Sequence, residues 1–295
     1  MKRQQKNNRI IFDIIRIVVL LIAFSVLLYP AVSNYLYEKN SGKVISVYDE
    51  KAVQMSGEER EQMIAEARAY NEEMLGNVEL LDPFSTGKRE VNERYERILD
   101  MNGSGMMGHV RIPSIHVDLP IYHGTSEEVL QVGVGHFEGT SFPVGGESTH
   151  TVLTGHRGLP SKKLFTDMDE LKEGDVFYIK VAGETLAYEI DQILTVLPED
   201  TEALSIVPGK DYATLVTCTP YAVNTHRLLV RGHRIPYEEA VEKEPDKVER
   251  RKIPFEIKVL IAAILMILAV FIGVRVYEGK QKKKRRRGKR GRRKR

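Results

Sequence analysis

The sequence is poor in cysteine and lacks tryptophan. Its 295 residues include one Cys and no Trp, while 42% are apolar and 29% are charged. One thiol cannot form a disulfide within its own chain, so a disulfide-stapled scaffold is excluded. The apolar content is ample for a packed core, which excludes wholesale disorder. The length suits one domain of about 200 residues with additional segments, or two small domains.

Closely spaced metal ligands are also missing. No HxxH, HxH or CxxC spacing occurs among the eight His and the single Cys. We therefore expect no metal site and no other cofactor. The carboxylates Glu127, Glu128 and Glu138 are scattered in an acidic region, and groups of this kind are usually solvated surface side chains.

The net charge of +3 hides a segregated distribution. Residues 280–295 carry 13 Lys or Arg and no acid, and residues 1–35 carry five bases and one acid, so the middle of the chain is strongly acidic. A basic tail of this kind can bind nucleic acid. Here it follows a hydrophobic run within a few residues. We therefore predict that it contacts anionic membrane lipid and that no nucleic acid is bound.

Two charge-free hydrophobic runs, Ile17–Tyr29 and Val259–Val274, lie near the ends of the chain. With their flanks, each reaches the roughly 20 residues that span a bilayer. The first could instead be a cleaved signal peptide, because Ala31–Ser33 offers small residues at a cleavage position. The second could be a buried core helix, but it has no polar face. Basic flanks stay in the cytoplasm, so we predict a cell-membrane protein with both termini inside and the intervening segment outside.

These features divide the chain into seven segments. They are a basic cytoplasmic N-terminus (1–16), a transmembrane helix or signal anchor (17–35), a helical region (36–105), a β-rich domain (106–236), a charged linker (237–254), a second transmembrane helix (255–277) and a basic cytoplasmic tail (278–295).

The region before the β-rich domain has helical signals. Ser56 and Glu59 have the spacing of a capping box, in which each side chain bonds the backbone amide of the other. Apolar residues then recur at helical spacing over Met63–Leu75, and Gly76 ends the pattern. A second, short helix is predicted at Val91–Leu99.

From about residue 107 the chain changes to short strands punctuated by Gly and Pro. Eight strands over about 130 residues, interrupted by one short helix around Lys162–Leu171, predict a mostly β fold, either a closed barrel or a sandwich. The predicted strands are Met107–Ile112, His116–Ile121, Gly135–Phe137, Thr149–Thr154, Val176–Val181, Thr185–Val196, Tyr212–Cys218 and Arg227–Arg234.

Cys218 is the first candidate for chemistry. It ends a strand, and Pro220 soon after must leave the ladder because it has no amide hydrogen. A lone Cys is usually an inert, buried small side chain. An idle thiol is a liability in an outward-facing protein, however, and a strand end presents its side chain at a barrel rim. A nucleophilic role is therefore the alternative.

A nucleophilic thiol needs a proton acceptor or a cation beside it. Among the His residues, His156 is the most suggestive, because it follows a strand and lies in a loop between glycines. No Asp or Asn partner for it is evident. Arg227 and Arg231 share one face of the last strand, and either could stabilise an oxyanion or pair with surface carboxylates. The pattern alone does not choose between them.

Taken together, these segments resemble the sortase family. The resemblance rests on Thr214–Cys218 with Arg227 nine positions later, on Leu153–Gly158 upstream, and extends over Gly108–Arg234. Within the family the chain is similar to class C, the pilus-assembling sortases. That similarity rests on the paired hydrophobic segments and on Asp82-Pro83-Phe84, which matches a lid motif.

The resemblance implies a sortase-like eight-stranded β-barrel with short helices, an N-terminal helical extension carrying the lid, and flanking transmembrane helices. Cys218 would be the nucleophile, His156 the general acid and base, and Arg227 the stabiliser of the oxyanion or substrate backbone. The family cleaves an LPXTG-like sorting signal between Thr and Gly, holds the acyl group as a thioester and transfers it to an amine. In class C the amine is typically a Lys of another pilin. Pilin subunits on a Gram-positive cell envelope are therefore the expected partners.

The triplet Asp82-Pro83-Phe84 would act as a lid in this scheme. Asp82 would pair with Arg227, Phe84 would cover the thiol, and Pro83 would shape the backbone between them. An ordinary turn is the alternative interpretation.

Two other functions stay open at this point. A housekeeping sortase would anchor surface proteins to cell-wall precursor, and its acceptor would distinguish it. A non-catalytic, membrane-tethered adhesin or binding module would leave Cys218 unreactive.

Overall fold

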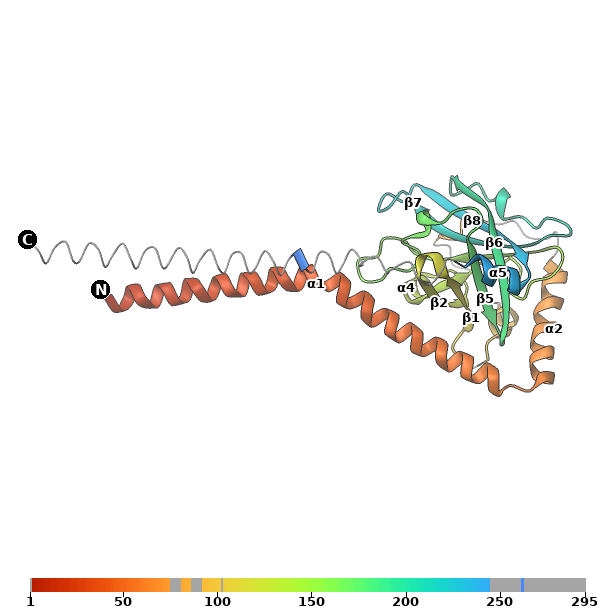
Figure 1. Ribbon diagram of the computed structural model, residues 1–295, viewed down its shortest axis with the longest axis horizontal. Coiled ribbons are helices and arrows are strands. Elements are labelled where there is room, and N and C mark those ends of the chain that lie inside the picture. Colours follow the sequence, from red (N-terminus) through yellow and green to blue (C-terminus); the bar gives the residue numbers. More distant parts are fainter. Residues whose placement is uncertain (1, 75–80, 86–91, 102, 245–260, 263–295) are drawn as a thin grey trace, which may run out of the picture. The chain divides into compact units, whose positions relative to one another are not determined.

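The computed structural model describes residues 2–74, 81–85, 92–101, 103–244 and 261–262. The chain forms two compact units, one comprising Met1–Ser33 with Glu249–Arg295 and the other Asn34–Val248. The predicted basic tail and nearly all of the second predicted transmembrane segment lie outside the described residues, as do Gly76 and Val91. The second unit contains the β-rich domain and the candidate site (Figure 1).

The first hydrophobic run lies within a single long helix, α1 (Lys2–Gln54), which contains Pro30. Its part Val18–Gln54 is apolar and long enough to cross a membrane, with a mean hydropathy of 1.9 in the window that meets this criterion. Within the described residues this is the one helix that meets the criterion. The helix continues well beyond residue 35, because its C-terminal part packs against the β-rich domain.

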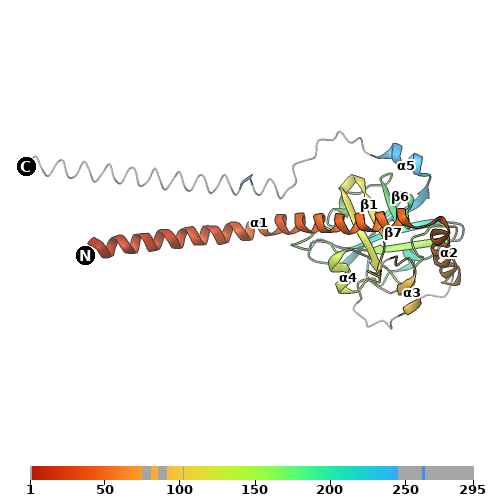
Figure 2. The same cartoon turned by 90° about the horizontal axis from the view of Figure 1, so that it is seen from below.

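Tyr48 fastens this part of α1 to the barrel. Its hydroxyl donates to the Met107 carbonyl at 2.7 Å and accepts from the Ala182 amide at 2.9 Å. The ring is 1% exposed, so both bonds are shielded from water. Figure 2 shows the C-terminal part of α1 running along the barrel past β1 (Met106–Ile112).

The capping box predicted at Ser56 and Glu59 is present. The Glu59 amide donates to Ser56 Oγ at 3.2 Å, and the Ser56 amide donates to Glu59 Oε2 at 2.9 Å. The Ser56 amide and hydroxyl both donate to Glu59 Oε2, which holds the pKa of Glu59 below its usual range. The box begins α2 (Gly57–Met74). The second predicted helix is shorter than expected, α3 (Glu93–Arg97), and is capped by the Asn92 side chain.

The eight predicted strands are all present and close into a barrel in the order β1-β2-β3-β4-β7-β8-β6-β5. This order excludes the sandwich. Neighbours pair antiparallel except for β2 with β3 and β4 with β7, which are parallel. Beyond β1, the strands are β2 (Val117–His123), β3 (Val134–His136), β4 (Thr149–Thr154), β5 (Val176–Val181), β6 (Glu184–Val196), β7 (Asp211–Thr219) and β8 (His226–Ile235).

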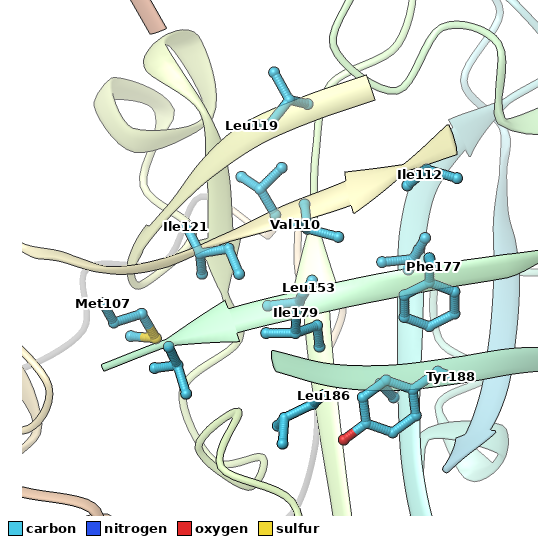
Figure 3. Packing of buried hydrophobic residues seen from close by; sticks show 14 of the residues in the cluster. Met107, Val110, Ile112, Leu119, Ile121, Leu153, Phe177, Ile179, Leu186 and Tyr188 are labelled. Atoms are coloured by element: carbon cyan, nitrogen blue, oxygen red, sulfur yellow. The ribbon is translucent and has the colours of Figure 1, made fainter. Parts of the chain in front are cut away.

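The core lies inside this barrel. Side chains from several strands, among them Val110, Ile121, Leu153 and Ile179, point toward one another in the interior (Figure 3). Buried residues of α2 and α3 belong to the same cluster, so the N-terminal helices are part of the domain. Burial of this apolar surface is the main favourable contribution to folding.

The short helices are where the sequence interpretation was wrong. The helix expected around Lys162–Leu171 is only a 3₁₀ turn, Met168–Glu170. A helix that was not expected, α4 (Glu127–Val132), follows β2 and is capped by Ser126. The charged linker begins with another helix, α5 (Tyr237–Lys243), because Ala240 is buried against an apolar cluster on the barrel.

Smaller departures have local causes. The second strand starts at Val117 and not at His116, because Pro113 opens a 3₁₀ turn, Pro113–Ile115, that His116 ends in the left-handed region at φ 55°. Another 3₁₀ turn, Glu202–Leu204, lies between β6 and β7.

Candidate active site

The parallel pairing of β4 and β7 brings His156 and Cys218 to the same barrel edge. Thr154 is paired with Val216 in this ladder. His156 lies two residues after Thr154, and Cys218 lies two residues after Val216. The two candidates therefore follow the same pair of the parallel ladder at the same distance along the chain. Two further bonds hold the segments together: the Gly155 amide donates to the Val216 carbonyl at 3.0 Å, and the Thr217 hydroxyl donates to the Gly155 carbonyl at 2.8 Å.

The antiparallel pairing of β7 and β8 places Arg227 directly opposite Cys218. Opposed residues in such a ladder project from the same face of the sheet, with their Cβ atoms about 5 Å apart. Arg231, the other candidate, is bound elsewhere. Its Nε lies 3.0 Å from Asp191 Oδ1 and its guanidinium lies over the Tyr212 ring. The structure therefore selects Arg227 as the guanidinium beside the thiol.

Asp82 binds Arg227 through both carboxylate oxygens. Arg227 Nε donates to Oδ1 at 2.8 Å and Nη2 donates to Oδ2 at 2.7 Å. The side chains are 10% and 17% exposed, so this charge-assisted pair is only weakly screened by water. The bond to Asp82 holds the pKa of Arg227 above its ordinary value. The remaining Nη1 donates to the carbonyls of Asn224 and His226.

The rest of the triplet lies against the same group of side chains. The Phe84 ring centre is 5.0 Å from the Arg227 guanidinium carbon and 5.8 Å from the centre of the His156 imidazole. Pro83 is buried, and the Phe84 amide bonds Asp82 Oδ1 at 3.3 Å, as in an Asx turn. One short segment thus contacts two of the three candidate residues.

Burial and charge act in opposite directions on the Cys218 thiol, which is 8% exposed. Burial is the largest influence and raises its pKa, because the thiolate loses hydration. The Arg227 guanidinium lowers it, and the Asp82 carboxylate raises it again. With Asp82 bound to Arg227, the net effect is a thiol that stays protonated more readily than a free cysteine.

His156 has a partner that the sequence did not reveal. Its Nε2 lies 3.3 Å from Oε2 of Glu127 on α4. The Glu127 side chain is 64% exposed, as expected of a surface carboxylate, and it nevertheless contacts a candidate site residue. The loop itself is fixed from the other side, where the Phe165 amide donates to the His156 carbonyl at 3.1 Å.

Two residues beside His156 explain the composition of its loop. A Cβ atom at Gly155 would lie 2.6 Å from the Phe165 ring, so only glycine fits there. Arg157 Nη2 lies 2.7 Å from Asp169 Oδ2, and its Nη1 donates to Thr219 Oγ1 at 3.3 Å. Arg157 therefore links the His156 loop to the residue after Cys218. In the sequence, the only indication of this link was that Arg157 directly follows His156.

Four other histidines are buried and hydrogen-bonded within the fold, namely His109, His123, His136 and His150. Burial lowers the pKa of His136 to about 3 and that of His150 to about 4. His136 contacts the Tyr95 hydroxyl and the Ser141 carbonyl, and His123 contacts two backbone carbonyls. Burial therefore keeps His136 and His150 in the neutral form. In the described part of the chain, no cluster of three or more His, Cys, Asp or Glu could hold a metal ion.

Comparison with known proteins identifies related domains. Residues 110–235 match the family model described as the sortase domain. Sortase A of Streptococcus agalactiae is 33% identical over 131 residues, which are 43% of this chain and 52% of that protein. The chain thus spans about half the length of this curated relative.

Solved structures match over a longer region. Streptococcus pneumoniae sortase C is 49% identical, with a TM-score of 0.61, covering 66% of this chain and 97% of that one. A sortase C of Group B Streptococcus described as pilus-related is 50% identical, with a TM-score of 0.60, covering 65% and 96%.

Proposed function

The chain belongs to the sortase family, and from this membership we propose that it is a membrane-anchored, pilus-assembling cysteine transpeptidase of class C. The carrying observation is that strand pairing places Cys218 opposite Arg227 and in step with His156 at one barrel edge. The Asp82 pair with Arg227 and the pilus-related structural neighbours favour class C over a housekeeping sortase.

In the first step, Cys218 Sγ attacks the Thr carbonyl of an LPXTG-like sorting signal. The thiol proton passes to His156, and Arg227 donates hydrogen bonds to the oxyanion or to the substrate backbone. His156 then gives its proton to the departing Gly amine as the peptide bond breaks. The product is a thioester between Cys218 and the Thr carbonyl.

In the second step, the amine of a pilin Lys attacks the thioester. His156 takes a proton from this amine, and the departing sulfur regains one as the amide forms. The reaction exchanges an activated acyl bond for a stable isopeptide bond and joins one pilin to the next. Water must be kept from the thioester for transfer to exceed hydrolysis, which is consistent with a covered site.

The lid is the proposed regulator of this chemistry. With Asp82 on Arg227 and Phe84 against the imidazole, a substrate carbonyl has no free guanidinium to bind. We infer that the lid leaves the site when a pilin arrives.

The membrane arrangement follows from the hydrophobic and basic segments. The apolar part of α1 anchors the chain, and the run 255–277 forms a second span. Both basic termini lie in the cytoplasm near anionic lipid, and the catalytic domain faces outward across a Gram-positive cell envelope.

The direct test uses the full chain in detergent with an LPXTG-type peptide. Hydroxylamine should trap the acyl group from the native protein and from Asp82→Ala/Phe84→Ala, and should trap none from Cys218→Ala. A Lys-containing pilin fragment should be joined in preference to a cell-wall precursor amine. Trapping that survives loss of the thiol would exclude the mechanism, and preference for the precursor amine would favour the housekeeping alternative.

A further inference from the structure

We propose that Glu127 is a positioning residue for His156, and that it fixes the imidazole tautomer in which Nδ1 exchanges protons during transpeptidation. The inference rests on the proposed role of His156. It is carried by the 3.3 Å approach of Glu127 Oε2 to His156 Nε2. In the described part of the chain, Glu127 is the one carboxylate within ion-pair distance of this imidazole.

The tautomer follows from the chemistry of the two partners. An ionised carboxylate only accepts hydrogen bonds, so the nitrogen facing it must carry the hydrogen. A neutral imidazole has one N–H, and placing it on Nε2 leaves the lone pair on Nδ1. Nδ1 is then the atom that accepts the thiol proton and later delivers it to the leaving amine. A His156 without this partner would distribute its hydrogen between both nitrogens.

Glu127 is held in place although it is exposed. Its other oxygen, Oε1, accepts a hydrogen bond from Gln131 Nε2 at 2.7 Å, one turn along α4. The start of α4 is fixed by Ser126, whose hydroxyl accepts from the Val129 amide. At its other end, the Gln131 carbonyl accepts from the ammonium of Lys162, which lies in the segment that follows the His156 loop. The helix is therefore fastened to the same region of the chain as the imidazole.

The exposure of Glu127 sets the size of the effect. At 64% exposure the pair is screened by water, and exposed pairs contribute weakly. We expect loss of the carboxylate to lower kcat about fivefold, with little change in KM, because the residue does not contact substrate. This is far smaller than the loss expected on removing Cys218.

The test compares Glu127→Ala and Glu127→Gln with Glu128→Ala, in the full chain labelled with ¹⁵N-histidine. Glu128 is the next residue of α4 and carries the same charge, but it bonds Ser126 and not His156. At about pH 8, ¹⁵N shifts should show the hydrogen on Nε2 in the native protein and in Glu128→Ala. Glu127→Ala should show mixed tautomers and the lower kcat. Glu127→Gln should restore the Nε2 tautomer, because its amide oxygen still accepts.

Two results would overturn the proposal. One is a native protein with the hydrogen on Nδ1. The other is a Glu127→Ala variant whose tautomer and kcat match those of Glu128→Ala. Failure of the proposed function is a separate outcome, because it appears as activity retained by Cys218→Ala and leaves the ¹⁵N shifts of His156 unaffected.

Discussion

At the scale of single residues, the pKa of the Cys218 thiol is affected by burial, by the Arg227 guanidinium and by the Asp82 carboxylate, in that order. The carboxylate occupies the guanidinium of Arg227, and it raises the pKa of Cys218. In the proposed lid, this carboxylate therefore also offsets the Arg227 guanidinium, which lowers the pKa of the thiol. Under the proposed function, regulation and activation would be coupled through the same two hydrogen bonds.

Replacing Asp82 should shift the titration of Cys218. In Asp82→Asn the carboxylate no longer raises the pKa of the thiol, and Arg227 is left to lower it. The midpoint of alkylation rate against pH should therefore move to lower pH, and alkylation at neutral pH should become faster. Asp191→Asn is the matched control. It removes the carboxylate that binds Arg231, which lies on β8 as Arg227 does. Identical midpoints for Asp82→Asn and the native protein would contradict this coupling.

Arg227 and Arg231 provide a second comparison at this scale. Arg227→Ala should slow transpeptidation by roughly 10²–10³, because a preorganised oxyanion donor is lost. Arg231→Ala removes the same side chain four residues along β8, where it bonds Asp191, and should leave kcat close to native. Steady-state transfer of an LPXTG-type peptide to an amine measures both. Equal losses in the two variants would mean that Arg227 acts only through stability.

At the scale of secondary-structure elements, the loop after β4 must stay aligned with the end of β7. Arg157 provides the side-chain link, through Asp169 on one side and Thr219 on the other, and is 7% exposed. The link is short, since Thr219 directly follows Cys218.

Arg157→Ala should therefore lower both stability and kcat. Loss of the charge-assisted bonds should cost about 1 kcal/mol in the free energy of unfolding, reduced by the exposure of Asp169. The His156 loop should also become looser and transfer slower. Urea unfolding and transfer kinetics measure the two effects. Arg94→Ala breaks a bidentate pair with Glu73 on the exposed surface and should change neither appreciably. A native kcat in Arg157→Ala would show that the link is purely structural.

Strands were easier to predict than helices for a physical reason. Apolar runs bounded by Gly and Pro define strand ends to within a residue or two, as for Thr149–Thr154 and Val176–Val181. A helix of six residues such as α4 has too few turns to show a period. The expected helix near Lys162 failed because its segment is held by turn bonds, including that from the Phe165 amide to His156.

The candidate site was only partly predictable from the sequence. The chemistry of a thiol, an imidazole and a guanidinium could be anticipated from residue types at strand ends. Residue types alone did not distinguish Arg227 from Arg231. The register of β7 with β8 was needed, because it pairs Arg227 with Cys218. The contact of Glu127 with His156 joins positions 29 apart and depends on how α4 lies beside the His156 loop, which no local pattern encodes.

At the scale of the whole molecule, the barrel buries neutral histidines that matter for stability and not for chemistry. His136 is hydrogen-bonded at both ring nitrogens and stacks on Phe142, while His150 bonds Ser205 and Thr214. Both are 1% exposed or less. Protonating either one inside the fold would place a charge away from water, so the fold holds them in the neutral form.

This burial makes global stability depend on pH in a defined direction. The pKa values of His136 and His150 are lowered to about 3 and about 4, whereas an unfolded His titrates near 6.5. The unfolded chain therefore binds more protons below about pH 6.5. Stability from these groups is complete above that pH and is lost as pH falls toward 4, by about 1.4 kcal/mol per pH unit for each His.

Urea unfolding between about pH 7 and 5 isolates this effect, because most carboxylates titrate below that window. The chain has no Trp, so the transition is best followed by the near-ultraviolet circular dichroism of its 13 Tyr. His136→Gln should flatten the slope of unfolding free energy against pH by about one proton, even if it lowers stability overall. A native slope near zero in this window would mean that the buried histidines are already protonated in the folded barrel, which their carbonyl, hydroxyl and aromatic neighbours disfavour.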